Sequence, residues 1–284
     1  MKINIGLAQI YPKLGDVQAN LEKQLDYVKQ AEAENVDLLI FPEMSLTGYQ
    51  VQDLAPKVAI RAEKDDAAFA TMLDASHKMD IMFGFVRRDK QQRLFTSSAY
   101  LSGGECLHIH DKIYLPTYTL FDEGRFFDAG DDVRTFETRF GRVGMLICED
   151  FWHMSLPYML WLDGAEMLLL QSASPGRGLS TDDKLDGTRF VELANQTYGS
   201  MFSSYVIHCN RVGYEDGKNF YGGSSIVDPN GNFIINGVYF DETLIVQSVD
   251  LNQVNRTRSR LPLLRDERLH LVQRELARIL VNDR

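Results

Sequence analysis

The chain has 284 residues, 44% of them hydrophobic, and a formal net charge of −10 at pH 7. This length fits one large domain or two small ones, and the apolar content is sufficient for a core. The negative charge argues against nucleic acid and anionic membranes as partners, and no apolar run approaches the roughly 18 residues that a membrane helix needs. The N-terminus lacks the apolar stretch of a signal peptide, and the three cysteines are too widely spaced for a disulfide framework or a Cys-x-x-Cys metal pattern. We therefore expect a cytoplasmic globular protein.

The first half of the chain alternates strand patterns with helical patterns. A strand over 3–9 leads into a turn, where Asp16 is placed to cap the helix that follows. In order, the pattern then predicts helix 17–34, strand 36–41, helix 56–79, strand 81–86, a hairpin of strands 94–101 and 105–110, and a long loop over 112–132.

The second half repeats this alternation. It predicts strands 133–138 and 142–147, helix 154–163, strand 166–171, helix 182–199, strand 204–210, and strands near 220–227, 232–236 and 243–250. Two such halves predict an α/β fold in which two packed mixed sheets are covered by helices, an α-β-β-α sandwich over residues 1–250. Residues 251–284 hold eight arginines and end in a helical pattern. We expect them to form a C-terminal arm that packs on its own domain or on an oligomer partner.

The segment 141–153 places a cysteine at the end of a strand. The apolar run 143–147 predicts a buried strand, and Cys148 stands on the turn before the next helical pattern. Backbone N–H groups near a helix start favour a thiolate and bind an oxyanion. A buried cysteine is more often a small core residue, however, so this turn alone does not identify a nucleophile.

Two charged residues also stand where strand patterns end. Glu43 follows the apolar run 38–42, and Lys112 follows the strand that ends at Asp111. A single charged residue past a strand is usually solvated surface. Together with Cys148, these two supply the base, cation and thiol that acyl transfer through a thioester needs.

Four segments, in this order along the chain, resemble the nitrilase superfamily of carbon–nitrogen hydrolases. They are Phe41-Pro-Glu-Met-Ser-Leu-Thr-Gly-Tyr49; Asp111-Lys-Ile-Tyr-Leu-Pro116, leading to Phe121-Asp-Glu-Gly-Arg-Phe-Phe127; the turn at Cys148; and Ser172-Ala-Ser-Pro175, followed by Asn210-Arg-Val-Gly213 and Tyr221-Gly-Gly-Ser-Ser225. The resemblance covers most of residues 3–250. It implies that Glu43, Lys112 and Cys148 form a catalytic triad, and that the chain forms a homo-oligomer, a dimer or larger, through the helices that flank the cysteine.

Within this superfamily, the segments around Phe121 and Cys148 look most like the glutaminase domain of glutamine-dependent NAD synthetases. Those proteins carry a second, ATP-using domain with a Ser-Gly-Gly-x-Asp-Ser loop. Here Ser102-Gly-Gly104 is followed by Glu105 and Cys106, and we expect no room for that domain in this chain. The resemblance therefore implies either a free-standing amidase or a subunit that passes ammonia to a separate synthetase partner.

The expected mechanism follows from the placement of charge. In water, moving a proton from a free thiol to a free glutamate is uphill by about 5–6 kcal/mol, so we expect Lys112 and the backbone turn to favour the thiolate. Glu43 takes the thiol proton, the thiolate attacks an amide carbonyl, and Lys112 and the N–H of Glu149 hold the oxyanion. Glu43 then protonates the leaving ammonia and activates water. By resemblance, Glu123 matches the family's second glutamate and anchors Lys112.

Other residues are candidates for the substrate site. Trp152 either lines the acyl pocket or fills the core. Ser172 and Ser174, just past strand 166–171, either contact substrate or cap a helix. The further candidates for the wall of the site are Tyr49, Tyr118 and Phe121.

Histidines offer two competing hypotheses. His108 and His110 share one face of a strand, a spacing that suits zinc, but the sequence shows no third ligand nearby. His153 follows Cys148 closely enough to suggest a Cys–His pair, but Glu43 already fills the role of base. We expect no metal and no organic cofactor.

The sequence thus predicts an enzyme that hydrolyses a small carboxamide, with a glutamine-like amide as one candidate. N-carbamoyl compounds and nitriles are alternative substrates. A metal hydrolase is an alternative class, and so is a catalytically silent subunit that binds partners through the same fold.

Overall fold

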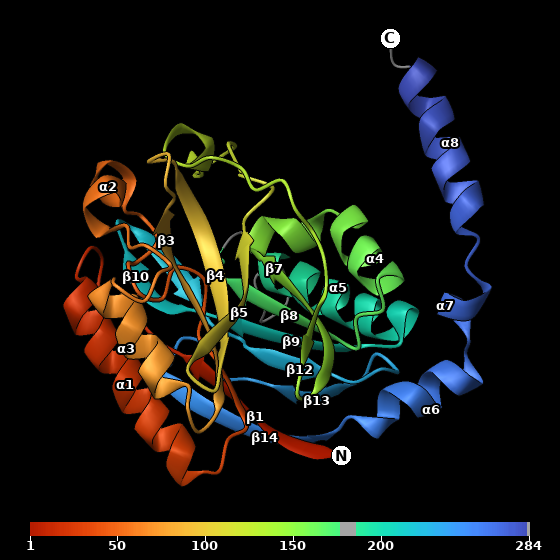
Figure 1. The fold of residues 1–284 in the computed structure, drawn as a ribbon, viewed down its shortest axis with the longest axis horizontal. Helices are drawn as coiled ribbons and strands as arrows, with labels where there is room; N and C mark the ends of the chain where they lie inside the picture. The colour runs from red at the N-terminus through yellow and green to blue at the C-terminus, as the bar shows by residue number, and fades with distance from the viewer. Residues whose placement is uncertain (177–185, 283–284) are drawn as a thin grey trace.

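In the computed structural model, which describes residues 1–176 and 186–282, two six-stranded sheets pack face to face and carry helices on their outer sides (Figure 1). The first sheet has the strand order β14-β1-β2-β3-β4-β5, and the second has the order β13-β12-β9-β8-β7-β6. This architecture confirms the predicted α-β-β-α sandwich.

The first sheet joins the beginning of the chain to a late strand. Its members are β1 (Lys2–Gln9), β2 (Leu38–Ile40), β3 (Asp80–Arg88), β4 (Leu94–Ser102), β5 (Glu105–Asp111) and β14 (Thr243–Asp250). Strands β1, β2 and β3 run parallel, and β14 pairs antiparallel with the whole of β1. Because β4 pairs antiparallel with both β3 and β5, β5 runs in the same direction as β2, and both strands end at the same edge of the sheet.

The second sheet is parallel at its centre. Its members are β6 (Phe136–Thr138), β7 (Gly141–Ile147), β8 (Met167–Ser172), β9 (Tyr205–Asn210), β12 (Ser225–Val227) and β13 (Phe233–Asn236). Strands β7, β8 and β9 are parallel neighbours, so their carboxyl ends meet at one edge. The hairpin of β10 (Val212–Glu215) and β11 (Lys218–Tyr221) lies outside both sheets, and its first strand was not predicted.

Helices cover the outer face of each sheet. The first sheet carries α1 (Val17–Ala33) and α3 (Ala67–Ala75), and the second carries α4 (Ser155–Leu162) and α5 (Asp186–Phe202) (Figure 1). Three short 3₁₀ helices are η1 (Gln52–Leu54), η2 (Glu123–Arg125) and η3 (Cys148–Trp152). The carboxylate of Asp16 accepts the N–H of Ala19, which confirms the predicted cap of α1.

Three apolar layers follow from the alternation of side chains along the strands. Between the sheets, Ile5, Leu7 and Ile40 pack in one cluster with Leu169 and Ile207. Separate clusters fill the space beneath α1 and α3 and beneath α4 and α5. The central layer fixes how the strand ends of the two sheets face one another.

The predicted helix over 56–79 is wrong. The chain forms α2 (Ala55–Val58), leaves the helical conformation at Ala59, and begins α3 only at residue 67. The N–H of Ile60 donates to Val86 at 3.0 Å, and its carbonyl accepts from Arg88 at 2.9 Å, so this residue extends beside β3 instead. Asp66 then caps α3. Tertiary pairing with a strand outweighs the local helical pattern here.

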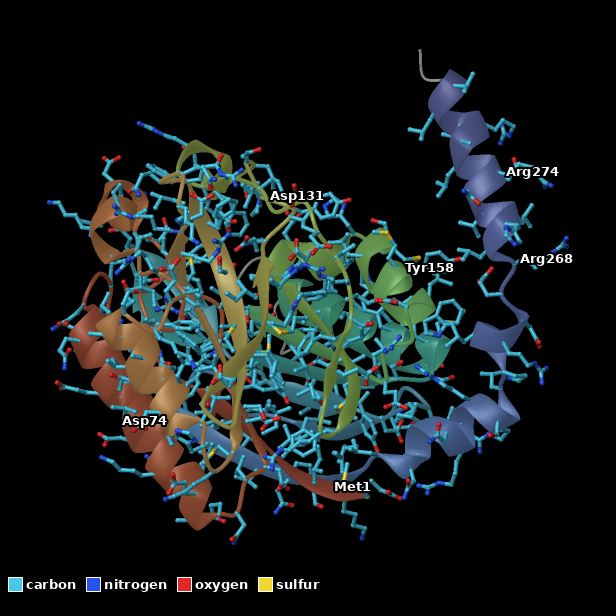
Figure 2. All side chains as sticks on the ribbon, in the orientation of Figure 1. Met1, Asp74, Asp131, Tyr158, Arg268 and Arg274 are labelled. Carbon is cyan, nitrogen blue, oxygen red and sulfur yellow. The ribbon has the colours of Figure 1, made fainter. Side chains whose placement is uncertain are left out.

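The C-terminal arm, residues 251–282 in the structure, holds α6 (Asn252–Arg260), α7 (Leu263–Asp266) and α8 (Leu269–Asn282). Val254 of α6 is buried against the body, but α8 stands away from it, as the positions of Arg268 and Arg274 in Figure 2 show. Among the described side chains of α8, none is buried. No helix within the described ranges is long and apolar enough to cross a membrane.

Candidate active site

Four strands deliver their following residues to one place at the edge of the sandwich. Glu43 comes after β2, Lys112 after β5, Cys148 after β7 and Ala173 after β8. The ammonium Nζ of Lys112 lies 2.8 Å from Oε1 of Glu43, and the N–H of Ala173 donates to Oε2 of the same carboxylate at 2.7 Å. Both oxygens of Glu43 are therefore bound. Lys112, which follows a strand of the first sheet, holds one oxygen, and Ala173, which follows a strand of the second sheet, holds the other.

A second carboxylate completes the surroundings of Lys112. Its Nζ lies 2.8 Å from Oε1 of Glu123, and that oxygen also accepts the hydroxyl of Tyr49 at 2.5 Å. Burial lowers the pKa of Lys112, but the charges of Glu123 and Glu43 outweigh burial and raise this pKa well above its ordinary value. The ammonium therefore stays protonated although its side chain is fully buried.

Glu123 is the second carboxylate beside Lys112. Burial raises its pKa, the charge of Lys112 lowers it and the charge of Glu43 raises it, and together these effects bring the pKa of Glu123 to about 7. Its Oε2 is buried and has no hydrogen bond with the described residues. The charged form of Glu123 is therefore costly in this buried position.

Cys148 is held in a strained conformation at the start of η3. Its φ is +48°, in the left-handed region that residues other than glycine, asparagine and aspartate rarely adopt. Its side chain is buried. Burial and the charge of Glu43 raise the pKa of its thiol well above the ordinary value, while Lys112 lowers it by less. The sequence predicts a favoured thiolate. The structure instead favours the protonated thiol, because burial and the charges of Glu43 and Glu123 outweigh the ammonium of Lys112.

A small pocket opens beside the thiol. Its free volume is about 20 Å³, the space of a single water molecule. Five of the predicted site residues are among those that line it. The lining residues are Pro116, Phe121, Cys148, Glu149, Trp152, Ser174, Pro175, Gly187, Val191 and Tyr221.

The pocket presents hydrogen-bond donors that the described residues do not satisfy. Nε1 of Trp152, Oγ of Ser174 and the hydroxyl of Tyr221 are buried and make no hydrogen bond of good geometry within residues 1–176 and 186–282. The nearby hydroxyl of Ser174 lowers the pKa of Tyr221. Burial raises this pKa by more, so the phenol keeps its proton. Each such group costs about 1–3 kcal/mol when it is left unpaired, so these donors suit a ligand with acceptor oxygens.

A carboxylate faces this pocket as well. Both oxygens of Glu149 accept the hydroxyl of Tyr118 at 2.9 Å, and the ring of Tyr118 meets that of Phe121 edge-on, with the ring centroids 5.8 Å apart. Tyr118 is 43% exposed, so it stands at the rim. This arrangement offers an acceptor for a positively charged ligand group.

Two predicted substrate-site residues, one from the wall and one proposed polar contact, do not line this pocket. Tyr49 binds Glu123 and lies in the network around Lys112, beyond the pocket lining. Ser172 is fully buried, and its hydroxyl is 2.9 Å from Nε2 of His208 on the side of the sheet that faces α5. Two of the histidines considered as ligand or base pack against rings: His108 stacks on Phe136, and His153 stacks on Tyr114.

Sequence reasoning missed three members of the site. Tyr221 lies within a segment that carries the family resemblance, but no role was assigned to it. Ala173 acts through its backbone N–H, which no side-chain pattern reveals. Asp150 follows Cys148 by two residues and is fully buried, and a buried carboxylate needs several hydrogen-bond donors. Its position next to the cysteine was the available signal.

Fold and site together define a class of protein, the hydrolases that act on carbon–nitrogen bonds. The family described as carbon–nitrogen hydrolase matches residues 4–259. The chain belongs to this family.

Relatives in this family fall into two kinds. The chain is 30% identical over 251 residues to the glutamine-dependent NAD(+) synthetase of Acinetobacter baylyi, a match that covers 88% of this chain and 44% of that protein. It is 29% identical over 266 residues to a probable nitrilase of Schizosaccharomyces pombe, which covers 91% of this chain and 92% of that one. The chain thus spans a little under half the length of the synthetases that it matches.

Solved structures show the same fold. The glutamine-dependent NAD+ synthetase of Acinetobacter baumannii aligns with a TM-score of 0.81 at 26% identity, over 89% of this chain and 47% of that one. A carbon–nitrogen hydrolase from Helicobacter pylori G27 aligns with a TM-score of 0.85 at 21% identity, over 97% and 98% of the two chains. The second likeness concerns the fold alone.

Proposed function

We propose that this protein hydrolyses a small carboxamide through a thioester on Cys148, releasing ammonia and a carboxylic acid. The observation that carries the proposal is the buried network in which Lys112 binds Glu43 and Glu123 while the charges of all three act on the thiol. A base, a cation and a thiol in one water-poor site are the groups that this chemistry requires.

The steps follow from the hydrogen bonds. As the sulfur of Cys148 attacks the carbonyl carbon, its proton passes to Glu43, whose carboxylate is held by Lys112 and by the N–H of Ala173. Because the resting thiol keeps its proton, we place this transfer together with the attack rather than before it. Lys112 and the N–H of Glu149 stabilise the oxyanion. Glu43 then gives its proton to the departing nitrogen, ammonia leaves, and water activated by Glu43 hydrolyses the thioester.

The groups that line the pocket match a glutamine-like substrate better than a simple amide, and the pocket must widen beyond its free volume of about 20 Å³ to admit one. Such a molecule carries a carboxylate and an ammonium at the end remote from its amide. The unpaired donors of Trp152, Ser174 and Tyr221 match the first group, and the carboxylate of Glu149 matches the second. The likeness to glutamine-dependent enzymes supports the same choice.

The released ammonia suits a synthetic reaction as well as simple release. Relatives of this chain are named as glutamine-dependent NAD(+) synthetases. We propose a synthetase partner that takes up the ammonia. Three unpaired cysteines fit a reducing compartment such as the cytoplasm for this work.

The chain also carries surfaces that suit a second copy. Exposed apolar side chains lie at α4 and α5 of the body and on α8 of the arm. Those of the body are Met154, Met159, Phe190, Leu193 and Met201. Those of the arm include Leu269, Leu276, Ile279 and Leu280. A groove of about 680 Å³ separates these two sets near Tyr158 and Leu271. We propose a homo-oligomer in which these apolar faces are covered, with residues 1–250 as the hydrolase domain and residues 251–284 as the arm.

The decisive experiment measures ammonia release from glutamine, small aliphatic amides, an N-carbamoyl amino acid and a nitrile. We expect release from glutamine or a close analogue, and a loss of at least roughly 1000-fold in Cys148→Ala. Intact-mass spectrometry during turnover should show an acyl adduct on the wild type and none on the variant. Absence of release from every compound, together with absence of an adduct, would favour the catalytically silent subunit. Activity that survives Cys148→Ala but is lost with a chelator would favour a metal hydrolase.

A further inference from the structure

Asp150 is a fully buried carboxylate that receives four hydrogen-bond donors. Its Oδ1 accepts the backbone N–H groups of Ile113 at 3.0 Å and Tyr114 at 2.9 Å. Its Oδ2 accepts the N–H of Ile147 at 3.1 Å and lies 2.8 Å from Nε2 of His110, a side chain that is only 2% exposed. A carboxylate without nearby solvent, held by four donors, has one strongly preferred position.

These four donors come from the two segments that carry the proposed cation and nucleophile. Ile113 and Tyr114 directly follow Lys112, and His110 precedes it by two residues on β5 of the first sheet. Ile147 directly precedes Cys148 and ends β7 of the second sheet. One carboxylate thus fastens the end of β5 to the end of β7.

We propose that Asp150 and His110 form a positioning pair that sets the ammonium of Lys112 against the thiol of Cys148, an inference that rests on the proposed function. Neither side chain lines the pocket, so both act through other residues rather than on the substrate. The effect of Lys112 on the thiol depends on their separation, because a charge interaction weakens with distance. Loosening the pair therefore weakens the interaction with Lys112, whose charge favours ionisation of the sulfur.

Three substitutions separate this role from a structural one. Asp150→Asn keeps the size of the side chain but places an NH₂ group where an acceptor is needed, so the two hydrogen bonds at the oxygen that it replaces are lost. His110→Leu removes the imidazole donor. His110→Gln keeps a donor able to reach Asp150, and it should restore most of what the leucine variant loses.

The matched control is Asp80→Asn. Asp80 is also a buried carboxylate, and it binds the hydroxyls of Tyr100 and Ser102 at 2.7 Å each. It starts β3 beside Leu38, at the opposite end of the first sheet from Glu43. Its loss should lower the stability without changing the chemistry of the cysteine.

The main readout is the rate at which iodoacetamide alkylates Cys148 across a pH series, followed by peptide mass spectrometry so that Cys106 and Cys209 are counted separately. This measurement needs no substrate. We expect alkylation to slow by roughly 10-fold in His110→Leu and by roughly 100-fold in Asp150→Asn, with the apparent pKa of the thiol moved upward. On a substrate that wild type turns over, kcat should fall by similar factors while KM changes little.

The outcomes are separable. Slower alkylation in both variants, recovery in His110→Gln and no change in Asp80→Asn would support the positioning pair. Wild-type alkylation profiles in Asp150→Asn and His110→Leu, with a loss of thermal stability no different from that of Asp80→Asn, would overturn it. If no substrate is found, the proposed function fails, but the alkylation series still decides whether this pair sets the reactivity of the thiol.

Discussion

One buried ammonium, that of Lys112, lies between two buried carboxylates, and this makes the site a single electrostatic unit. Burying such groups is costly, and the cost is recovered only while each charge keeps its partners. Removing Lys112 would leave Glu43 and Glu123 facing one another without a counter-charge. The resting thiol keeps its proton because its burial, together with the charges of the two carboxylates, outweighs the charge of Lys112.

The variant Glu123→Gln tests the raised pKa of this carboxylate. The amide keeps an acceptor for Tyr49 and Lys112 but does not titrate. Because burial raises the pKa of Glu123 from 4.5 to about 7, the folded protein holds a proton that the unfolded chain releases between these values. The unfolding free energy of the wild type should therefore fall, relative to that of the variant, as the pH rises through this window.

Urea unfolding of both proteins between about pH 5 and about pH 8 measures this difference directly, since pH effects from all other groups are common to the two. A constant difference in unfolding free energy across that range would contradict the raised pKa.

At the scale of single elements, the turn that carries Glu43 leaves no room above strand β3. A Cβ atom added at Gly84 would lie 2.5 Å from the backbone nitrogen of Met44 and 2.8 Å from the carbonyl oxygen of Pro42. Backbone atoms cannot move aside as a side-chain end can. Gly84→Ala should therefore displace the turn and its carboxylate, and kcat should fall by roughly 100-fold, since misplacement by about 1 Å costs this much.

Steady-state kinetics together with circular dichroism check this prediction. The control is Gly6→Ala on β1, where the three atoms nearest to a new Cβ are side-chain methyl groups of Leu39 and Val36, at 3.0–3.3 Å. Comparable kcat values for the two glycine variants would show that the contact with β3 does not position Glu43.

Strand ends were the part of the site that could be predicted from sequence. An apolar run followed by Glu43, Lys112 or Cys148 locates each residue at the edge of a sheet, and parallel strands bring such edges together. The sequence could also have predicted which face of the sheet Ser172 lies on. Side chains alternate along a strand, so Ser172 shares the face beneath α5 with Leu168 and Leu170. The protonation state of the thiol could not be predicted in this way, because it depends on how many carboxylates surround the ammonium of Lys112 in space.

At the scale of the whole molecule, the arm is the part that the body does least to stabilise. An isolated helix of the length of α8 is marginal in water, and its apolar side chains are exposed. Leu276 lies on the apolar side of α8, and Arg274 lies about 200° around the helix from it. We expect Leu276→Gln to shift the protein from oligomer to monomer, and Arg274→Gln to leave its assembly unchanged.

Light scattering coupled to size-exclusion chromatography, over a range of protein concentrations, distinguishes the two variants. A wild type that is monomeric at every concentration, or an equal effect of both substitutions, would contradict the proposed role of the arm.

The pairing of β14 with the whole of β1, from Lys2 opposite Asp250 to Gln9 opposite Thr243, has a consequence for biosynthesis. Strand β1 leaves the ribosome long before β14 does, so the outer edge of β1 stays uncovered until β14 has been made. Until then, that edge offers unpaired backbone groups to any other extended chain. A nascent chain that stalls before residue 243 would therefore be prone to aggregate through the exposed edge of β1. Translation speed and chaperone supply should then affect how much folded protein a cell recovers.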